Sequence, residues 1–195
     1  LYANHMADKL MENLRLFSAR INIPRVIAVC NQVALWPELA YMYRCYDEFD
    51  NACEVMMQHP DAWEHVVFKD VCVKLSNGDL YYKAIKFYLD EHPTEMTNLL
   101  GVLQSRLDHS RVVALMRKEG KLPMVKEYLL AVQGANLAAV NDAVNELAIE
   151  EEDHEALRAS VDMYDNCDQL SLALQCEKHE LVEFRRISCH IYQRN

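Results

Sequence analysis

The sequence predicts an all-α fold, an α-solenoid (zigzag superhelix) of about 13 short helices that pair into antiparallel hairpins. Three observations predict it. Apolar residues recur at steps of three and four along most of the chain, which places them on one stripe of a helix. Helix-breaking residues interrupt this pattern every ~12 to 18 residues, a spacing typical of short packed helices. The chain has only 4 Gly and 5 Pro, too few turn residues for an all-β fold.

The clearest hairpin is expected between Leu122 and Ile149. Each half carries four apolar residues at the same steps, and these are Leu122, Val125, Leu129 and Val132, then Leu137, Val140, Val144 and Leu147. Gly134 stands between the halves and predicts a Gly-centred turn. Neither stripe can be buried by this hairpin alone, so we expect neighbouring hairpins on both sides. The sequence therefore predicts one run of helical-hairpin repeats over residues 1–195, a fragment of a longer solenoid leg.

Prolines and capping residues predict where the helices begin. Pro24, which follows Asn22, and Pro37 each stand where the first turn of a helix is expected. Pro60 and Pro93 are expected to begin further helices in the same way. Asp108 and Asp168 are expected to be N-caps.

Other residues predict where helices end or pack closely. Gly120 is expected to end a helix after two cations, and Asn77-Gly78 to end the helix that starts at Pro60. Gly101 lies inside a helical pattern, which indicates close packing there. The segment 66–75 is rich in β-branched residues and partly alternates like a strand. We expect a helix, because nothing else in the chain would pair with a lone strand.

Composition excludes several classes of protein. A net charge of −10 disfavours general nucleic-acid binding. A weak basic cluster consists of Arg111, Arg117, Lys118, Lys121 and Lys126. We interpret it as a solvated helix face, and a partner surface is the alternative. The 7 Cys form no CxxC pair, so we expect small core residues in a reducing compartment.

No run of about 18 apolar residues is present, so no membrane insertion is expected. No signal peptide is visible. Because the chain starts at Leu1 rather than Met, and ends at Asn195 within a helical pattern, we expect a piece of a longer protein.

Motifs that carry chemistry are weak throughout. Cys176, His179 and the pair Cys189-His190 lack the paired spacing of a zinc site, and packed Cys with surface His is the favoured interpretation. Asp108-His109-Ser110 contains three triad residue types, but adjacent helical residues point apart. No Gly-rich phosphate loop appears. We therefore expect no enzyme, no catalytic residue, no cofactor and no metal.

Aromatic residues gather in the first half of the chain. Packing between helices is the favoured role, and a peptide groove is the alternative. They are Trp36, Tyr41, Tyr43, Tyr46, Phe49, Trp63, Tyr81, Tyr82, Phe87 and Tyr88.

Several runs of residues strongly resemble the clathrin heavy chain, collinearly over essentially all 195 residues and somewhat nearer the plant type than the animal type. These runs are Phe17 to Pro24, Tyr46 to Ala52, Leu80 to Ala84, Arg106 to His109, and Glu177 to Arg186. The likeness falls in the proximal leg, the segment nearest the trimer hub.

The resemblance implies a structural coat protein rather than an enzyme. Three heavy chains would join at a hub, and their legs would interweave into the polyhedral lattice of coated pits and coated vesicles on the cytoplasmic side of the membrane. The process would be vesicle-mediated protein transport and endocytosis. The implied partners are the clathrin light chain, bound as an extended helix along the proximal leg, and other clathrin heavy chains.

The sequence departs from the family pattern at several places. Gln58 to Trp63 is one residue shorter than in the animal pattern. His92 stands where the animal heavy chain has a basic residue, and this change affects the expected light-chain contact. The resemblance therefore assigns no individual residue to light-chain binding, and the partner-binding residues stay unknown at this point.

Two alternatives belong to other classes. A peptide- or protein-binding adaptor solenoid would show a deep groove lined by Asn, Lys and aromatic residues, whereas a coat leg would show a flat zigzag. A tethering subunit of vesicle traffic could share the same repeat, but the long matching runs favour the coat protein.

Overall fold

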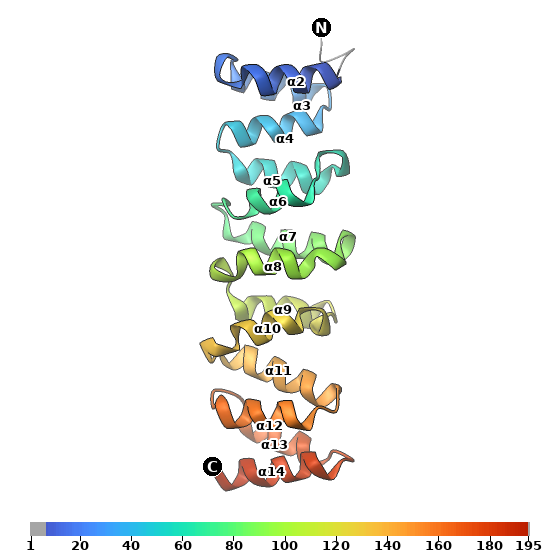
Figure 1. Ribbon diagram of the computed structural model, residues 1–195, viewed down its shortest axis with the longest axis vertical. Coiled ribbons are helices and arrows are strands. Elements are labelled where there is room, and N and C mark those ends of the chain that lie inside the picture. Colours follow the sequence, from blue (N-terminus) through green and yellow to red (C-terminus); the bar gives the residue numbers. More distant parts are fainter. Residues whose placement is uncertain (1–6, 195) are drawn as a thin grey trace. The chain divides into compact units, whose positions relative to one another are not determined.

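The structure is a computed structural model that describes residues 7–194. This part of the chain forms 13 α-helices, α2 to α14, joined by short 3₁₀ turns, and it contains no β-strand (Figure 1). The predicted all-α fold is confirmed. Contacts divide the chain into two compact units, Leu1–Glu95 and Met96–Asn195.

The first unit consists of short helices that contact their neighbours in the chain. Its helices are α2 (Ala7–Phe17), α3 (Ile23–Gln32), α4 (Trp36–Cys45), α5 (Phe49–Gln58), α6 (His65–Cys72) and α7 (Gly78–Glu91). The 3₁₀ turns are η1 (Ser18–Arg20), η2 (Pro60–Ala62) and η3 (Pro93–Glu95). Helix α4 packs on α3 and α5, and α5 packs on both α6 and α7.

The second unit repeats this arrangement. Its helices are α8 (Met96–Leu103), α9 (His109–Lys118), α10 (Lys126–Val132), α11 (Ala138–Glu150), α12 (His154–Met163), α13 (Gln169–Glu177) and α14 (Val182–Arg194). The 3₁₀ turns are η4 (Gln104–Arg106), η5 (Leu122–Val125) and η6 (Gln133–Ala135). Helix α11 packs on α9, α10 and α12, and α14 packs on α12 and α13. Within each unit a helix thus contacts helices one or two places away, as in a solenoid.

The predicted hairpin between Leu122 and Ile149 is present as η5, α10 and α11. Its two stripes are buried, except that Leu137 is half-buried at the N-cap of α11. The turn is not centred on Gly134, because η6 continues through that residue. The left-handed residue is Asn136, with φ of 49°.

Most predicted helix starts are confirmed. Asn22 caps α3 by accepting from the Arg25 amide at 3.1 Å, and Pro24 and Pro37 lie in first turns. Asp108 and Asp168 cap α9 and α13 by accepting from amides of the first turn.

Four expectations were wrong in detail. Pro60 and Pro93 begin 3₁₀ turns rather than α-helices, and α6 begins only at His65. Asn77 does not end that helix, because its side chain caps α7. Gly101 is exposed, and a Cβ added there would meet nothing within 4 Å, so it marks no close packing. The strand-like segment is helical, as expected.

Four helices end in one motif, in which a left-handed residue follows the helix and the next amide donates back to the last turn. The left-handed residues are Ala34, Asp47, Gly120 and Glu152, with φ between 57° and 64°. The returning bonds are 2.9 Å long, for example from the Glu48 amide to the Tyr43 carbonyl. This is a Schellman ending, and Gly120 confirms the predicted end of α9.

Candidate functional site

Aromatic and imidazole rings gather at one corner of the first unit, where η2, the start of α6 and the end of α7 meet. Trp63 follows η2 with an extended backbone (φ −89°, ψ 131°), so its ring reaches α7. It stacks on His92, with ring centroids 3.6 Å apart and planes at 5°. The rings of Phe87 and Tyr88 lie 6.3 and 6.1 Å from it. Segments distant in the sequence thus form one ring cluster.

A polar chain runs from the buried Tyr88 to the partly exposed Glu95. The Tyr88 hydroxyl is 3.0 Å from Nδ1 of His65, and Nε2 of His65 is 3.1 Å from a Glu95 carboxylate oxygen. Burial raises the pKa of Tyr88, and the nearby Cys72 and Glu95 add to this. The phenol therefore keeps its proton. This chain ties α6, α7 and η3 together.

A pocket of about 380 Å³ opens beside the ring cluster. We call it the Trp63 pocket. Its apolar walls are Met57, Pro60, Trp63 and Phe87, and its remaining lining residues include Asp90 and Glu91. Nε1 of Trp63 is buried and has no hydrogen-bond partner among the described residues. The pocket is large enough to take a large apolar side chain of a partner.

Trp36 forms a second tryptophan–histidine stack, but it does not line the Trp63 pocket. Its ring lies on His59, with centroids 3.7 Å apart and planes at 4°. His59 and His92 each precede a proline that begins a 3₁₀ turn. The predicted packing role of the aromatics is thus confirmed for these tryptophans. The repeated His-Pro dipeptide is the sequence signal that could have located both stacks.

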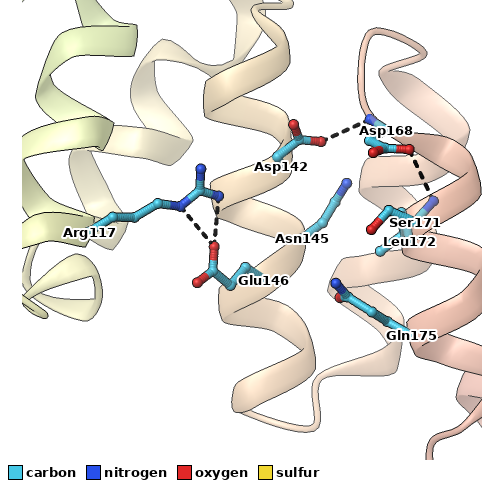
Figure 2. Close-up of a pocket in the computed structure, with 8 residues that line it drawn as sticks. All are labelled: Arg117, Asp142, Asn145, Glu146, Asp168, Ser171, Leu172 and Gln175. Atoms are coloured by element: carbon cyan, nitrogen blue, oxygen red, sulfur yellow. Dashed lines mark hydrogen bonds and ion pairs between the residues drawn. The ribbon is translucent and has the colours of Figure 1, made fainter.

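The second unit carries a pocket of different chemistry between α11 and α13, and Figure 2 shows its lining residues. It measures about 210 Å³. Arg117 reaches it from α9 and donates to Glu146 from Nη2 at 2.7 Å and from Nε at 3.0 Å. We call this the Asn145 pocket, after the buried amide in its wall.

The basic cluster is an exposed helix surface whose members are partly paired. Arg117 bonds to Glu146 on α11, and Lys126 bonds to Glu151 at the C-cap of α11. Lys118 and Lys121 are exposed. The exposure of these side chains agrees with the solvated-face interpretation.

The residues considered for zinc have other partners. Cys176 is buried, which raises its thiol pKa to about 11. The His179 ring packs against Phe184 at 4.1 Å, and His190 bonds to Asp162 at 2.8 Å. Within residues 7–194, no group of three His, Cys, Asp or Glu side chains is placed to hold a metal ion.

The triad-like residues also have structural roles. The Asp108 carboxylate caps α9, and Nδ1 of His109 lies 2.7 Å from the Tyr128 hydroxyl. The backbone amide of Ser110 is one of the two donors to the Asp108 cap. This agrees with the expected helix cap.

The seven cysteines are all free thiols. The expectation of core packing holds for the buried residues Cys30, Cys53, Cys72 and Cys176. Hydrogen bonding to Cys53 and burial raise the pKa of Cys72, so that thiol stays protonated. The expectation is wrong for Cys45 and Cys189, which are exposed.

In the described part of the chain, no helix is both long and apolar enough to cross a bilayer. A family model described as "Region in Clathrin and VPS" matches residues 1–96 and again residues 100–195. The chain belongs to the clathrin heavy-chain repeat family.

Relatives from several kingdoms share this sequence. The chain is 57% identical to clathrin heavy chain 1 of Oryza sativa subsp. japonica, 50% identical to clathrin heavy chain of Dictyostelium discoideum and 48% identical to clathrin heavy chain 2 of Homo sapiens. Each match covers 100% of this chain but only 11% of the rice protein and 12% of the other two. The chain thus spans about an eighth of these relatives or less.

Clathrin-type repeats account for the two units. The boundary between the two family matches lies close to the boundary between the units at Glu95 and Met96. The higher identity to the rice protein agrees with the predicted plant likeness. The alignment with the human protein is one position longer than that with the rice protein.

Proposed function

We propose that this chain is a leg segment of a clathrin-type coat. In this proposal it is a structural element of the polyhedral lattice at the cytoplasmic face of coated pits and vesicles, and it contacts other heavy chains there. The observation that carries the proposal is the 43–57% identity to clathrin heavy chains over the whole chain. The same identity favours the coat protein over a tethering subunit that shares the repeat.

The layered helices suit a scaffold. Each helix contacts only near neighbours, so a continuous run of such layers over residues 1–195 would be stiff locally and bendable over its length. A lattice held by many weak contacts can also come apart. Full-length protein should assemble into cages, while the 195-residue chain alone should stay monomeric by light scattering. Cages formed by the short chain alone would contradict the need for a hub and complete legs.

We further propose that the clathrin light chain binds the first unit and inserts an apolar side chain into the Trp63 pocket. The apolar walls and the ring stack support this assignment. The carboxylates of Asp90 and Glu91 favour basic residues beside the inserted side chain.

The test is a binding titration of purified light chain against three variants of the chain. Trp63→Ala should weaken binding at least ~10-fold, because an anchoring aromatic residue in an interface typically contributes 2 kcal/mol or more. Trp36→Ala is the matched control, because it removes the same kind of ring stack but does not line the pocket. Equal affinity of the two tryptophan variants would reject the pocket as the contact.

Charge reversal gives a second arm. Lys83 pairs with Glu54 at 3.3 Å, within the first unit. Lys83→Glu should therefore change light-chain affinity less than Trp63→Ala does. If Lys83→Glu lowers the affinity more than Trp63→Ala does, the light chain binds the outer face of α7 instead of the pocket.

A further inference from the structure

The Asn145 pocket of the second unit has a chemistry that the coat role does not use. We propose that it binds an extended, basic segment of a partner protein, by taking one main-chain carbonyl and one lysine or arginine side chain. This proposal is independent of the light-chain contact, which concerns a helix and the other unit.

A hydrogen-bond chain fixes the orientation of the Asn145 amide. Nε2 of Gln133 donates to Oγ of Ser160 at 2.9 Å, so the hydroxyl proton of Ser160 is directed to Oδ1 of Asn145, 2.7 Å away. The amide oxygen of Asn145 is thereby held inward, and Nδ2 points the other way, into the pocket (Figure 2). Asn145 is only 2% exposed, and its Nδ2 has no partner among the described residues.

Nδ2 of Asn145 faces the pocket and is free to donate to a ligand there. A ligand that offers a carbonyl oxygen can accept from it. Helical segments cannot offer one from their interior, because their carbonyls already accept from amides four residues on. The donor therefore selects an extended segment.

Carboxylates supply the second part of the site. Asp142, Glu146 and Asp168 line the pocket together with one guanidinium, that of Arg117. Three negative charges against one positive charge leave a surplus of two negative charges. One oxygen of Asp142 accepts from the Asp168 amide at 3.0 Å, and one oxygen of Glu146 accepts from Arg117. The other oxygen of each carboxylate can accept from a cationic side chain.

The dimensions limit the ligand to a short piece of chain. The pocket, the smaller of the two, measures about 210 Å³, which suits one residue with its side chain. Ser171 and Gln175 line the same pocket from α13 and present a hydroxyl and an amide. These groups can pair with the main chain of the flanking residues.

The test is a nuclear magnetic resonance titration of the 195-residue chain with three capped tripeptides. They are acetyl-Ala-Lys-Ala-methylamide, its norleucine analogue, which lacks the charge, and its glutamate analogue. The lysine peptide should move the side-chain amide signals of Asn145 saturably, and the norleucine peptide should bind roughly 10-fold more weakly. The glutamate peptide should not bind.

Variants separate the two parts of the site. Asp142→Asn keeps the acceptor for the Asp168 amide but removes the charge, so it should weaken the lysine peptide roughly 10-fold and leave the norleucine peptide unchanged. Asn145→Leu should weaken both peptides. Glu127→Gln is the control, because Glu127 is exposed on α10 and does not line the pocket.

Three results would overturn the proposal: no saturable shift at Asn145, equal binding of the lysine and norleucine peptides, or wild-type affinity in Asp142→Asn. If Asn145→Leu does not fold, Ser171→Ala and Asp142→Asn carry the test. Neither the light chain nor an assembled coat is needed, so failure here leaves the proposed function untouched.

Discussion

The two units share one architecture but fill their interiors differently. In the described part of the first unit, the only buried polar or charged residue is Glu38, and large rings such as Phe68 and Tyr88 occupy the core. In the second unit the buried polar residues are Gln133, Asn141, Asn145, Ser160 and Ser188. Both interiors are otherwise apolar, so the second unit adds to its packed side chains a polar seam, the chain of Gln133, Ser160 and Asn145.

The difference determines what each unit presents to a partner. Apolar packing has no direction, so the ring cluster leaves a hole that suits an apolar side chain. Hydrogen bonds are directional, so the amide seam leaves a donor aimed along one line, Nδ2 of Asn145. The Trp63 pocket thus offers apolar surface to a partner, and the Asn145 pocket offers a hydrogen-bond donor.

The largest expected effect is the loss of a ring from the first unit. Phe68 is fully buried and packs against Phe87 and Tyr88, at centroid distances of 5.8 and 5.7 Å. Phe68→Ala should lower the free energy of unfolding by about 3–5 kcal/mol, because it removes apolar contacts and leaves a cavity. Urea unfolding followed by circular dichroism measures this. Val66→Ala, on the exposed side of the same helix, should change the free energy by less than about 0.5 kcal/mol.

A smaller effect is expected from removing the Ser160 hydroxyl, which links Gln133 to Asn145 in the second unit. Ser160→Ala should lower the free energy of unfolding by about 1–3 kcal/mol, because it leaves Nε2 of Gln133 and Oδ1 of Asn145 buried without a partner. The same urea experiment applies, with the exposed Ser105→Ala as control. A loss for Ser160→Ala as large as that for Phe68→Ala would contradict the ranking of the two kinds of interior.

Local features of the fold could be predicted from the sequence, because they depend on neighbouring residues. Helical stripes, the caps at Asn22 and Asp108 and the end at Gly120 all act within a few positions. Three other Schellman endings were missed, because Ala34, Asp47 and Glu152 carry no glycine signal.

The candidate sites could not be predicted in this way. The Trp63 and His92 stack joins residues on either side of two helices, and periodicity does not pair such residues. The free donor of Asn145 depends on the orientation of Ser160, which depends in turn on Gln133. A pattern of residue types records neither orientation.

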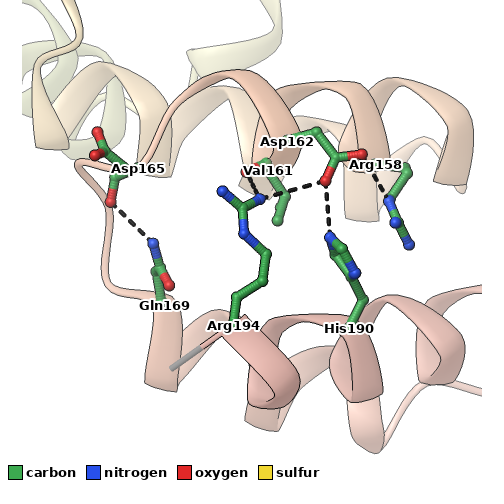
Figure 3. A network of polar contacts seen from close by, with 7 residues as sticks. All are labelled: Arg158, Val161, Asp162, Asp165, Gln169, His190 and Arg194. Atoms are coloured by element: carbon green, nitrogen blue, oxygen red, sulfur yellow. Dashed lines mark hydrogen bonds and ion pairs between the residues drawn. The ribbon is translucent and has the colours of Figure 1, made fainter.

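The smallest effect is expected from a polar network that belongs to neither interior. Asp162 on α12 accepts from Nε of Arg158 at 2.9 Å, from Nε2 of His190 at 2.8 Å and from Nη1 of Arg194 at 3.3 Å (Figure 3). The hydrogen bonds from Arg158 and then His190 hold the pKa of Asp162 below its ordinary value of 3.8. A carboxyl group whose pKa is lowered by folding stabilises the protein above its unfolded pKa, and this contribution is lost as the pH falls through the folded pKa.

The side chain of Asp162 is 47% exposed, so screening by water limits the contribution to a few tenths of a kcal/mol. Asp162→Asn should therefore be slightly less stable than the parent chain near about pH 6, and the difference should vanish below about pH 3. Adding salt should shrink the difference as well, whereas the losses at Phe68 and Ser160 should not respond to salt. Glu155→Gln, an exposed change on the same helix, serves as the control. A difference at Asp162 that grows as the pH falls would show that the network destabilises the fold, and would remove it from the contacts that hold α12 to α14.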